Sequence, residues 1–302
     1  MKEVLYITGS RGMVGSRFLE LTYKKYKILS PEIDELDITD KAAVDSFFDK
    51  ERPDHLVHFV AFTDVGAAEK ERGDESGPCW KINVSGTKNL AEASKKFSTF
   101  MVYISTDMVF PGSKDKQGPY DETDTPETDS AKVTWYGYTK SQGEKAIAEI
   151  IKDNYAILRI IYPVRAKFDQ KLDYIRKPLF LFDEGKLYPM FTDQQISISF
   201  IDEIAQALEK IISGRKTGIF HVSSTDTTSP YKLISYVIEK AGGVKNAVKP
   251  SSLNEFLKTV DNPVRYPMYG GLKVEKTEKA LGVRFSTWEQ IVDAIASQIS
   301  TS

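Results

Sequence analysis

Residues 4–15 read VLYITGSRGMVG, a short apolar run followed at once by three evenly spaced glycines. The run Val4–Thr8 has the composition of a buried strand, and Gly9, Gly12 and Gly15 form a G-x-x-G-x-x-G turn. Glycine is needed where a chain turns tightly, where the backbone approaches a ligand and where a helix packs against a strand. A helix that begins at such a turn presents unpaired N–H groups and its positive dipole end to phosphate. The stretch therefore predicts a strand–turn–helix unit that binds the pyrophosphate of a dinucleotide.

Apolar runs and stretches with helical spacing alternate from this turn to about residue 160. We expect further strands at 26–30, 56–61, 100–105 and 155–160, and helices at 15–26, 41–50, 82–97 and 136–152. This βαβα order predicts an α/β fold, a Rossmann-type doubly wound parallel sheet with helices on both faces.

The pattern becomes less regular after Pro163. We therefore expect two parts in the chain. The first is a dinucleotide-binding Rossmann domain of residues 1–162, to which residues 196–224 return. The second is a smaller, discontinuous substrate-binding lobe made of residues 163–195 and 225–302.

Composition argues against several classes of protein. The 302 residues carry 41 basic and 43 acidic side chains, a formal net charge of -2, which does not favour binding to nucleic acid or to an anionic membrane. No stretch approaches the roughly 20 apolar residues that cross a bilayer, and the N-terminus lacks the features of a signal peptide. With one cysteine, Cys79, and three histidines, no metal site is expected. We expect a cytoplasmic protein.

The second strand and the glycine turn bear on the choice of cofactor. A preference for NAD calls for an acidic residue at the tip of the second strand, where it binds the ribose hydroxyls. That strand ends near Leu29-Ser30-Pro31, with no acid at its tip, whereas Arg11 lies inside the glycine turn and can meet a 2′-phosphate. The sequence therefore predicts NADP (NADPH) as the preferred cofactor, with NAD as the alternative.

A tyrosine and a lysine stand four residues apart in Tyr136-Gly137-Tyr138-Thr139-Lys140, so on a helix their side chains are neighbours. A free tyrosine has a pKa of about 10, and we expect the ammonium of Lys140 to lower it. Tyr136 then gives a proton to a ketone oxygen that receives hydride. Thr106 follows a predicted strand, at the end where parallel sheets bind ligands, and its hydroxyl can bond to the same oxygen.

Several segments together resemble a known family. The chain is similar to the extended short-chain dehydrogenase/reductases and, within them, to the dTDP-4-dehydrorhamnose reductase family. The resemblance rests on these segments: Thr8-Gly9-x-x-Gly12-x-Val14-Gly15; Leu36-Asp37-Ile38-Thr39-Asp40; Arg52-Pro53-Asp54 leading to Val57-His58; Ile82-Asn83; Tyr103-Ile104-Ser105-Thr106-Asp107-x-Val109-Phe110; Tyr120-x-Glu122; Tyr136-Gly137-x-Thr139-Lys140-x-x-Gly143-Glu144; Asp193-Gln194; and Arg265-x-Pro267.

The resemblance implies reduction of a 4-keto sugar linked to a nucleotide, with NADPH or NADH, and it leaves a homodimer open. It also implies roles for particular residues. The catalytic ones are Thr106, Tyr136 and Lys140; the cofactor-binding ones are Gly9, Arg11, Gly12, Met13, Val14, Gly15, Asp37, Ile38, Ala61 and Thr63, together with Tyr136 and Lys140; the substrate-binding ones are Asp107 and Arg265.

The sequence departs from the family at four places, all on the expected substrate side. They are Met108 in place of a tyrosine, the altered segment 193–199, the longer segment 65–80, and Ile160-Ile161-Tyr162-Pro163. These differences keep two alternatives open. One is a non-catalytic, NADP-binding regulatory subunit that resembles the β subunit of methionine adenosyltransferase, and the other is a nucleotide-sugar epimerase.

Overall fold

The computed structural model describes residues 2–300, and side chains as far as residue 298. The chain divides into two compact units. The first contains residues 2–110, 125–159 and 204–220, and the second contains residues 111–124, 160–203 and 221–300. Which unit binds which ligand stays a prediction.

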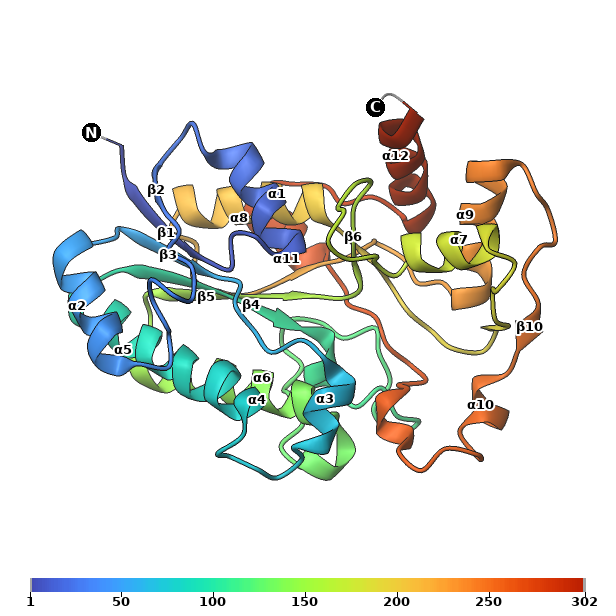
Figure 1. The fold of residues 1–302 in the computed structure, drawn as a ribbon, viewed down its shortest axis with the longest axis horizontal. Helices are drawn as coiled ribbons and strands as arrows, with labels where there is room; N and C mark the ends of the chain where they lie inside the picture. Colours follow the sequence, from blue (N-terminus) through green and yellow to red (C-terminus); the bar gives the residue numbers. More distant parts are fainter. Residues whose placement is uncertain (1, 301–302) are drawn as a thin grey trace. The chain divides into compact units, whose positions relative to one another are not determined.

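A six-stranded sheet has the order β2-β1-β3-β4-β5-β9, and β1 pairs in parallel with β2 and β3, as β3 does with β4. Figure 1 shows α1 and α8 on one face of the sheet and α2, α5 and α6 on the other. The predicted doubly wound parallel fold is therefore confirmed. The strands are β1 (Val4–Thr8), β2 (Lys27–Leu29), β3 (His55–His58), β4 (Phe100–Thr106), β5 (Tyr155–Ile160) and β9 (Gly218–Val222).

The helices around these strands begin where the sequence supplies a cap. Gly12 precedes α1, Asp40 accepts a hydrogen bond from Ala43 N (3.0 Å) at the start of α2, and Thr134 does the same for Gly137 N at α6 (3.0 Å). The helical elements are α1 (Met13–Thr22), α2 (Lys41–Glu51), α3 (Val65–Lys70), α4 (Pro78–Trp80), the π-helix η1 (Lys81–Gly86), α5 (Thr87–Phe97), the 3₁₀ turns η2 (Asp107–Val109) and η3 (Ser130–Lys132), α6 (Trp135–Ile151) and α8 (Ile201–Ser213).

One face of the sheet is packed by a core of aromatic and aliphatic side chains. Tyr6 of β1 lies 4.8 Å from Phe47 and 5.8 Å from Phe48 between ring centroids, both on α2. Ile38, Leu90 and Tyr103 belong to the same buried cluster. Because β1 and β4 are buried along almost their whole length, they read as nearly continuous apolar runs in the sequence.

The second unit has its own core and two short parallel strand pairs, β6 with β8 and β7 with β10. Val164, Leu233, Val237, Trp288 and Ile291 are among the buried residues of its core. Its elements are β6 (Pro163–Val164), α7 (Arg176–Asp183), β7 (Met190–Phe191), β8 (Ser199–Phe200), α9 (Pro230–Gly242), β10 (Pro250–Ser251), α10 (Leu253–Phe256), η4 (Pro263–Arg265), α11 (Glu275–Leu281) and α12 (Trp288–Ser300).

Helix α7 was not expected, because residues 164–195 show little hydrophobic period. It is organised by polar contacts: buried Asp173 accepts hydrogen bonds from Ile175 N (3.0 Å) and Arg176 N (2.9 Å), and pairs with the Arg176 guanidinium (2.7 Å). Within residues 2–300, no helix has both the length and the apolar character to cross a membrane.

Candidate active site

The glycine turn between β1 and α1 has the backbone that a phosphate-binding loop requires. Gly9 adopts φ +67°, and Gly12 N donates a hydrogen bond to Gly9 O at 3.0 Å. A Cβ atom at Gly15 would lie 2.4 Å from Gly9 O, so only glycine lets α1 begin this close to β1. At Gly12 a Cβ would meet only Gly9 O, at 3.2 Å, and the residue is exposed. Gly15 therefore shapes the turn, whereas Gly12 leaves one side of it open.

The turn also lies where ligands bind in open parallel sheets. In the sheet, β1 lies between β2 and β3. The chain continues from β1 to β2 on one side and then crosses to β3 on the other side, so the strand order reverses direction at β1. Ligands bind at the carboxyl ends of strands at such a switch point. Ala61 and Thr63 follow β3, and the exposed Thr63 lies in the loop before α3.

Arg11 in this turn is paired with an acidic residue that the sequence argument did not consider. Its Nε lies 2.9 Å from Oε1 of Glu32, which comes three residues after the end of β2. The Arg11 side chain is 75% exposed, so its charge remains accessible to solvent. A cation suited to a 2′-phosphate, in the turn, thus lies beside a carboxylate suited to a ribose hydroxyl, in the segment after β2.

A buried histidine connects the strands beneath the turn. Val60 N donates to Thr8 Oγ1 (3.2 Å), which lies 2.8 Å from His58 Nδ1, and His58 Nε2 lies 3.0 Å from Thr87 Oγ1. Burial lowers the pKa of His58 well below its usual range, and Lys140 acts in the same direction. A neutral imidazole that accepts at Nδ1 and donates at Nε2 satisfies this arrangement. The sequence signal for it, His58 at the end of β3, was noted only as part of a family motif.

Helix α6 approaches β4 closely because two of its residues are glycines. A Cβ atom at Gly137 would lie 1.9 Å from Met108 O, and one at Gly143 would lie 2.5 Å from the Tyr103 hydroxyl. These contacts place the start of α6 against the end of β4 and the following turn. Tyr136 immediately precedes Gly137, and Lys140 lies between the two glycines. Both residues are thereby brought to the carboxyl end of β4, where Thr106 lies.

Asn83 of the π-helix η1 fixes α6 from a second direction. Its Oδ1 accepts from Phe62 N (2.8 Å), and its Nδ2 donates to Thr139 Oγ1 (3.0 Å), next to Lys140. Asn83 is 1% exposed and Thr139 is fully buried. The loop after β3, which contains Ala61, is thus joined by side-chain hydrogen bonds to the helix that carries the catalytic candidates.

The three predicted catalytic residues come together in the first unit. Thr106 is 7% exposed and Lys140 is 2% exposed, and Lys140 Nζ lies 3.8 Å from the centre of the Tyr103 ring. The Tyr136 side chain forms a hydrogen bond with the Thr106 side chain, which places these two hydroxyls together. Tyr136 as a whole residue remains partly exposed.

The pKa of Tyr136 shifts in the direction opposite to the one expected from the sequence. We expected the Lys140 ammonium to lower the pKa of Tyr136, but burial raises that pKa, and the carboxylate of Asp107 and the thiol of Cys79 add to the rise. Burial lowers the pKa of Lys140 to about 7. Burial also raises the pKa of Asp107 to about 7. Tyr136 therefore holds its proton at neutral pH, the state that a proton donor needs.

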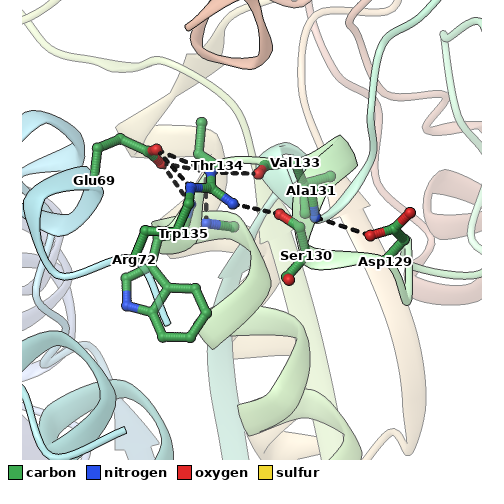
Figure 2. A network of polar contacts seen from close by, with 9 residues as sticks. Glu69, Arg72, Asp129, Ser130, Ala131, Val133, Thr134 and Trp135 are labelled. Atoms are coloured by element: carbon green, nitrogen blue, oxygen red, sulfur yellow. Dashed lines mark hydrogen bonds and ion pairs between the residues drawn. The ribbon is translucent and has the colours of Figure 1, made fainter. Parts of the chain in front are cut away.

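A clamp formed by Glu69 and Arg72 fixes the entry to α6, and Figure 2 shows it. Glu69 Oε1 accepts from Trp135 N at 2.6 Å, and Arg72 pairs with Glu69 at 2.9 Å. Arg72 also donates to the carbonyl oxygens of Ser130 (2.5 Å) and Val133 (2.9 Å). The segment 65–80, one of the departures from the family pattern, thus positions the residue that immediately precedes Tyr136.

An aromatic stack extends from the same place. Trp80 of α4 and Trp135 of α6 have ring centroids 5.8 Å apart with planes at 23°, and Trp135 and Tyr138 are 5.5 Å apart at 22°. Trp135 is 3% exposed. The stack packs the first turn of α6 against α4.

The remaining predicted residues occupy varied positions. Asp37 is exposed and accepts from Thr39 N at 2.8 Å, whereas Ile38 is buried in the sheet core. Asp107 lies in η2, directly after Thr106, and is 8% exposed. Arg265 is an exposed residue of η4 in the second unit. Met13 and Val14 form the first turn of α1 and are partly exposed. In the part of the chain that the structure describes, no group of three or more His, Cys, Asp or Glu side chains could hold a metal ion.

Comparison with known proteins adds to this geometry. Residues 1–301 match the family model described as the RmlD substrate binding domain. The chain belongs to this family. A relative, the dTDP-4-dehydrorhamnose reductase from Aggregatibacter actinomycetemcomitans, is 28% identical over 301 residues, 96% of this chain and 97% of the relative. A probable low-salt glycan biosynthesis reductase, Agl14 from Haloferax volcanii, is 26% identical over 98% of each chain.

Solved structures agree with the family assignment. The dTDP-4-dehydrorhamnose reductase of Bacillus anthracis, solved in complex with NADP, superposes with a TM-score of 0.85 at 28% identity, covering 99% of this RmlD family chain and 100% of that one. The Bordetella bronchiseptica enzyme WbmG in complex with NAD gives a TM-score of 0.78 at 19% identity, covering 100% and 96%, which shows a shared fold. The resemblance inferred from the sequence motifs is confirmed.

Proposed function

We propose that this chain reduces a 4-keto sugar linked to a nucleotide, with NADPH as the preferred reductant and NADH as the alternative. The observation that carries the proposal is the meeting of Thr106, Tyr136 and Lys140 at the carboxyl end of β4, in the unit that also holds the glycine turn. The named relatives that match most of the chain are sugar-nucleotide reductases, which supports the same activity.

The residues of the turn fit a dinucleotide cofactor. The cradle formed by Gly9, Gly12 and Gly15 has an open side at Gly12, and the backbone N–H groups at the start of α1 suit a pyrophosphate. Arg11 would hold a 2′-phosphate, and Lys140 would hold the ribose of the nicotinamide. When bound, the cofactor supplies hydride to the carbonyl carbon of the sugar.

The side chains of this chain then manage the proton and the carbonyl oxygen. Thr106 donates a hydrogen bond to the ketone oxygen and holds it against Tyr136. Tyr136 transfers its phenolic proton to that oxygen as negative charge develops there. Its raised pKa keeps the proton in place until the reaction, and the Lys140 ammonium stabilises the phenolate that remains. Asp107, beside Thr106, would contact the sugar.

A turnover screen tests the proposal. Purified protein and NADPH are offered a panel of dTDP- and UDP-linked 4-keto sugars, and loss of NADPH absorbance is recorded. Tyr136→Phe should lower kcat by about two to four orders of magnitude, the usual contribution of a positioned acid, with cofactor affinity unchanged. Tyr138→Phe is the matched control, because Tyr138 lies on the same helix but stacks on Trp135. A wild-type protein that reduces no keto sugar refutes the activity, and a fully active Tyr136→Phe refutes the mechanism.

The proposal also covers the location, the binding partners and the assembly of the protein. We infer a cytoplasmic location, a nucleotide-sugar substrate and a homodimer as the assembly. A solved relative of the fold, WbmG, was crystallised with NAD and UDP, which supports a nucleotide-binding role for the fold. Sedimentation of the purified chain measures the assembly directly.

A further inference from the structure

A buried charged cluster lies one helical turn beyond Lys140. Glu144 of α6 forms a bidentate pair with Arg159 of β5, with Nε–Oε1 at 3.0 Å and Nη2–Oε2 at 2.7 Å. Ser105 of β4 donates to the same Oε1 at 2.5 Å. Arg159 is 0% exposed and Glu144 is 5% exposed. One carboxylate thus joins a helix and two strands, and the bidentate geometry fixes their relative orientation.

The cluster contacts the chain both before and after Thr106, at the carboxyl end of β4. Ser105 immediately precedes Thr106, and Phe110, whose ring lies 4.9 Å from the Arg159 guanidinium, immediately follows η2. Residues 106–109 therefore lie between Ser105 and Phe110, and both of these residues contact the Glu144–Arg159 ion pair. Movement of Thr106 away from α6 would require the Ser105 hydrogen bond or the Arg159–Phe110 contact to break.

The same carboxylate lies close enough to Lys140 to act on its charge. Glu144 favours the ammonium form of Lys140, against the effect of burial, which dominates. The other groups that face Lys140 are Cys79 from α4, the Tyr103 ring from β4 and the neutral His58 from β3. Among these groups, Glu144 is the carboxylate, and it is paired with Arg159.

We propose that Glu144, held by Arg159 and Ser105, is a positioning residue that keeps Thr106 of β4 and Lys140 of α6 in their places relative to each other. This role rests on the proposed reductase function for its effect on turnover. Its effect on Lys140 follows from the placement of the two residues four positions apart on α6, and it can be measured in the protein without substrate.

Ser105→Ala tests the geometric part of the proposal with a small change. The hydroxyl that joins β4 to Glu144 is removed, and kcat should fall about tenfold while the Kd for NADPH stays within about twofold of wild type, since the glycine turn is untouched. Ser94→Ala is the matched control: Ser94 of α5 is equally buried, at 0% exposed, and its Oγ has no hydrogen-bond partner among the described residues. Equal kcat for the two variants would overturn the positioning role.

Glu144→Gln tests the effect on charge. In protein labelled with ¹⁵N-lysine, the Nζ signal of Lys140, assigned with Lys140→Arg, is followed through a pH titration. Loss of the carboxylate should lower the Lys140 pKa by about one unit or more, and Glu144→Asp should restore most of it. An unchanged titration in the folded variant would refute the proposal, even if wild type turns over no keto sugar. If the unpaired Arg159 prevents Glu144→Gln from folding, Ser105→Ala decides the question.

Discussion

Gly137 lies so close to Met108 that a Cβ atom on the glycine would stand 1.9 Å from the Met108 carbonyl oxygen. Gly137→Ala should therefore push α6 away from β4, with an overpacking cost of about 1–3 kcal/mol and a large loss of kcat. Gly242→Ala, at the end of α9, is the control, because the nearest atom to its Cβ would be 3.9 Å away. Urea unfolding and turnover measure both effects. A Gly137→Ala variant as active as Gly242→Ala would contradict the close-approach argument.

The two ends of the glycine turn should respond differently to the same substitution. Gly12→Ala meets only Gly9 O at 3.2 Å, so the fold should survive, but the methyl group should block the approach of a pyrophosphate. Gly15→Ala brings a Cβ to 2.4 Å from the same oxygen and should destabilise the protein. Circular dichroism and NADPH fluorescence separate the outcomes. If a folded Gly12→Ala variant binds the cofactor tightly, the pyrophosphate does not bind against residue 12.

The Arg11–Glu32 pair should set the balance between the two cofactors. Arg11→Ala should weaken NADPH binding about tenfold and leave NADH nearly unchanged, because only NADPH carries the 2′-phosphate. Glu32→Gln should release Arg11 and strengthen NADPH binding relative to NADH. Calorimetric titration with both cofactors gives the four affinities. If Arg11→Ala binds NADPH as well as wild type does, the predicted role of Arg11 is wrong.

Asp107 should make the protein less stable as pH rises. Burial raises its pKa from 3.8 to about 7 in the folded protein. Between these two values the folded chain binds more protons than the unfolded chain, so the free energy of unfolding falls as pH increases. Asp107→Asn cannot titrate, and its stability relative to wild type should rise from about pH 4 to about pH 7 and then level off. Urea midpoints across this range provide the test, and a constant difference between the two proteins would disprove it.

Removing the clamp on α6 should loosen the segment before Tyr136. Arg72→Ala loses the hydrogen bonds to the Ser130 and Val133 carbonyls, and we expect a cost of about 1–2 kcal/mol with faster proteolysis within residues 125–134. Arg17→Ala is the control, since Arg17 pairs with Glu20 at the same i,i+3 spacing on the surface of α1. Equal proteolysis rates would indicate that the clamp does not hold this segment.

The features predicted from sequence are those encoded by local pattern. The strand Val4–Thr8, the glycine turn and the pair Tyr136 and Lys140 depend on neighbours a few residues away, so their placement could be read directly. Element ends shifted by a few residues: α1 begins at Met13, where Gly12 caps it, and it stops at Thr22. The parallel sheet with helices on both faces followed from the alternation of elements.

The features missed depend on pairs that are distant in sequence. Glu69 meets Trp135 across 66 positions, and His58 meets Thr87 across 29. Glu32 was overlooked because it lies beyond the tip of β2, although the loop brings it back to Arg11. The pKa of Tyr136 was expected to fall because the i,i+4 spacing reveals the lysine, whereas the burial that raises the pKa depends on the packing of several elements.

The stack of Trp80, Trp135 and Tyr138 gives the protein a built-in optical probe. Two of its three tryptophans lie in this stack, and Trp135 is bonded directly to Tyr136. Intrinsic emission should therefore report mainly on the first turn of α6. Reduced nicotinamide absorbs where indole emits, so a dinucleotide bound near Tyr136 should quench this light by energy transfer. Each step of binding at the site can then be followed in the unlabelled protein.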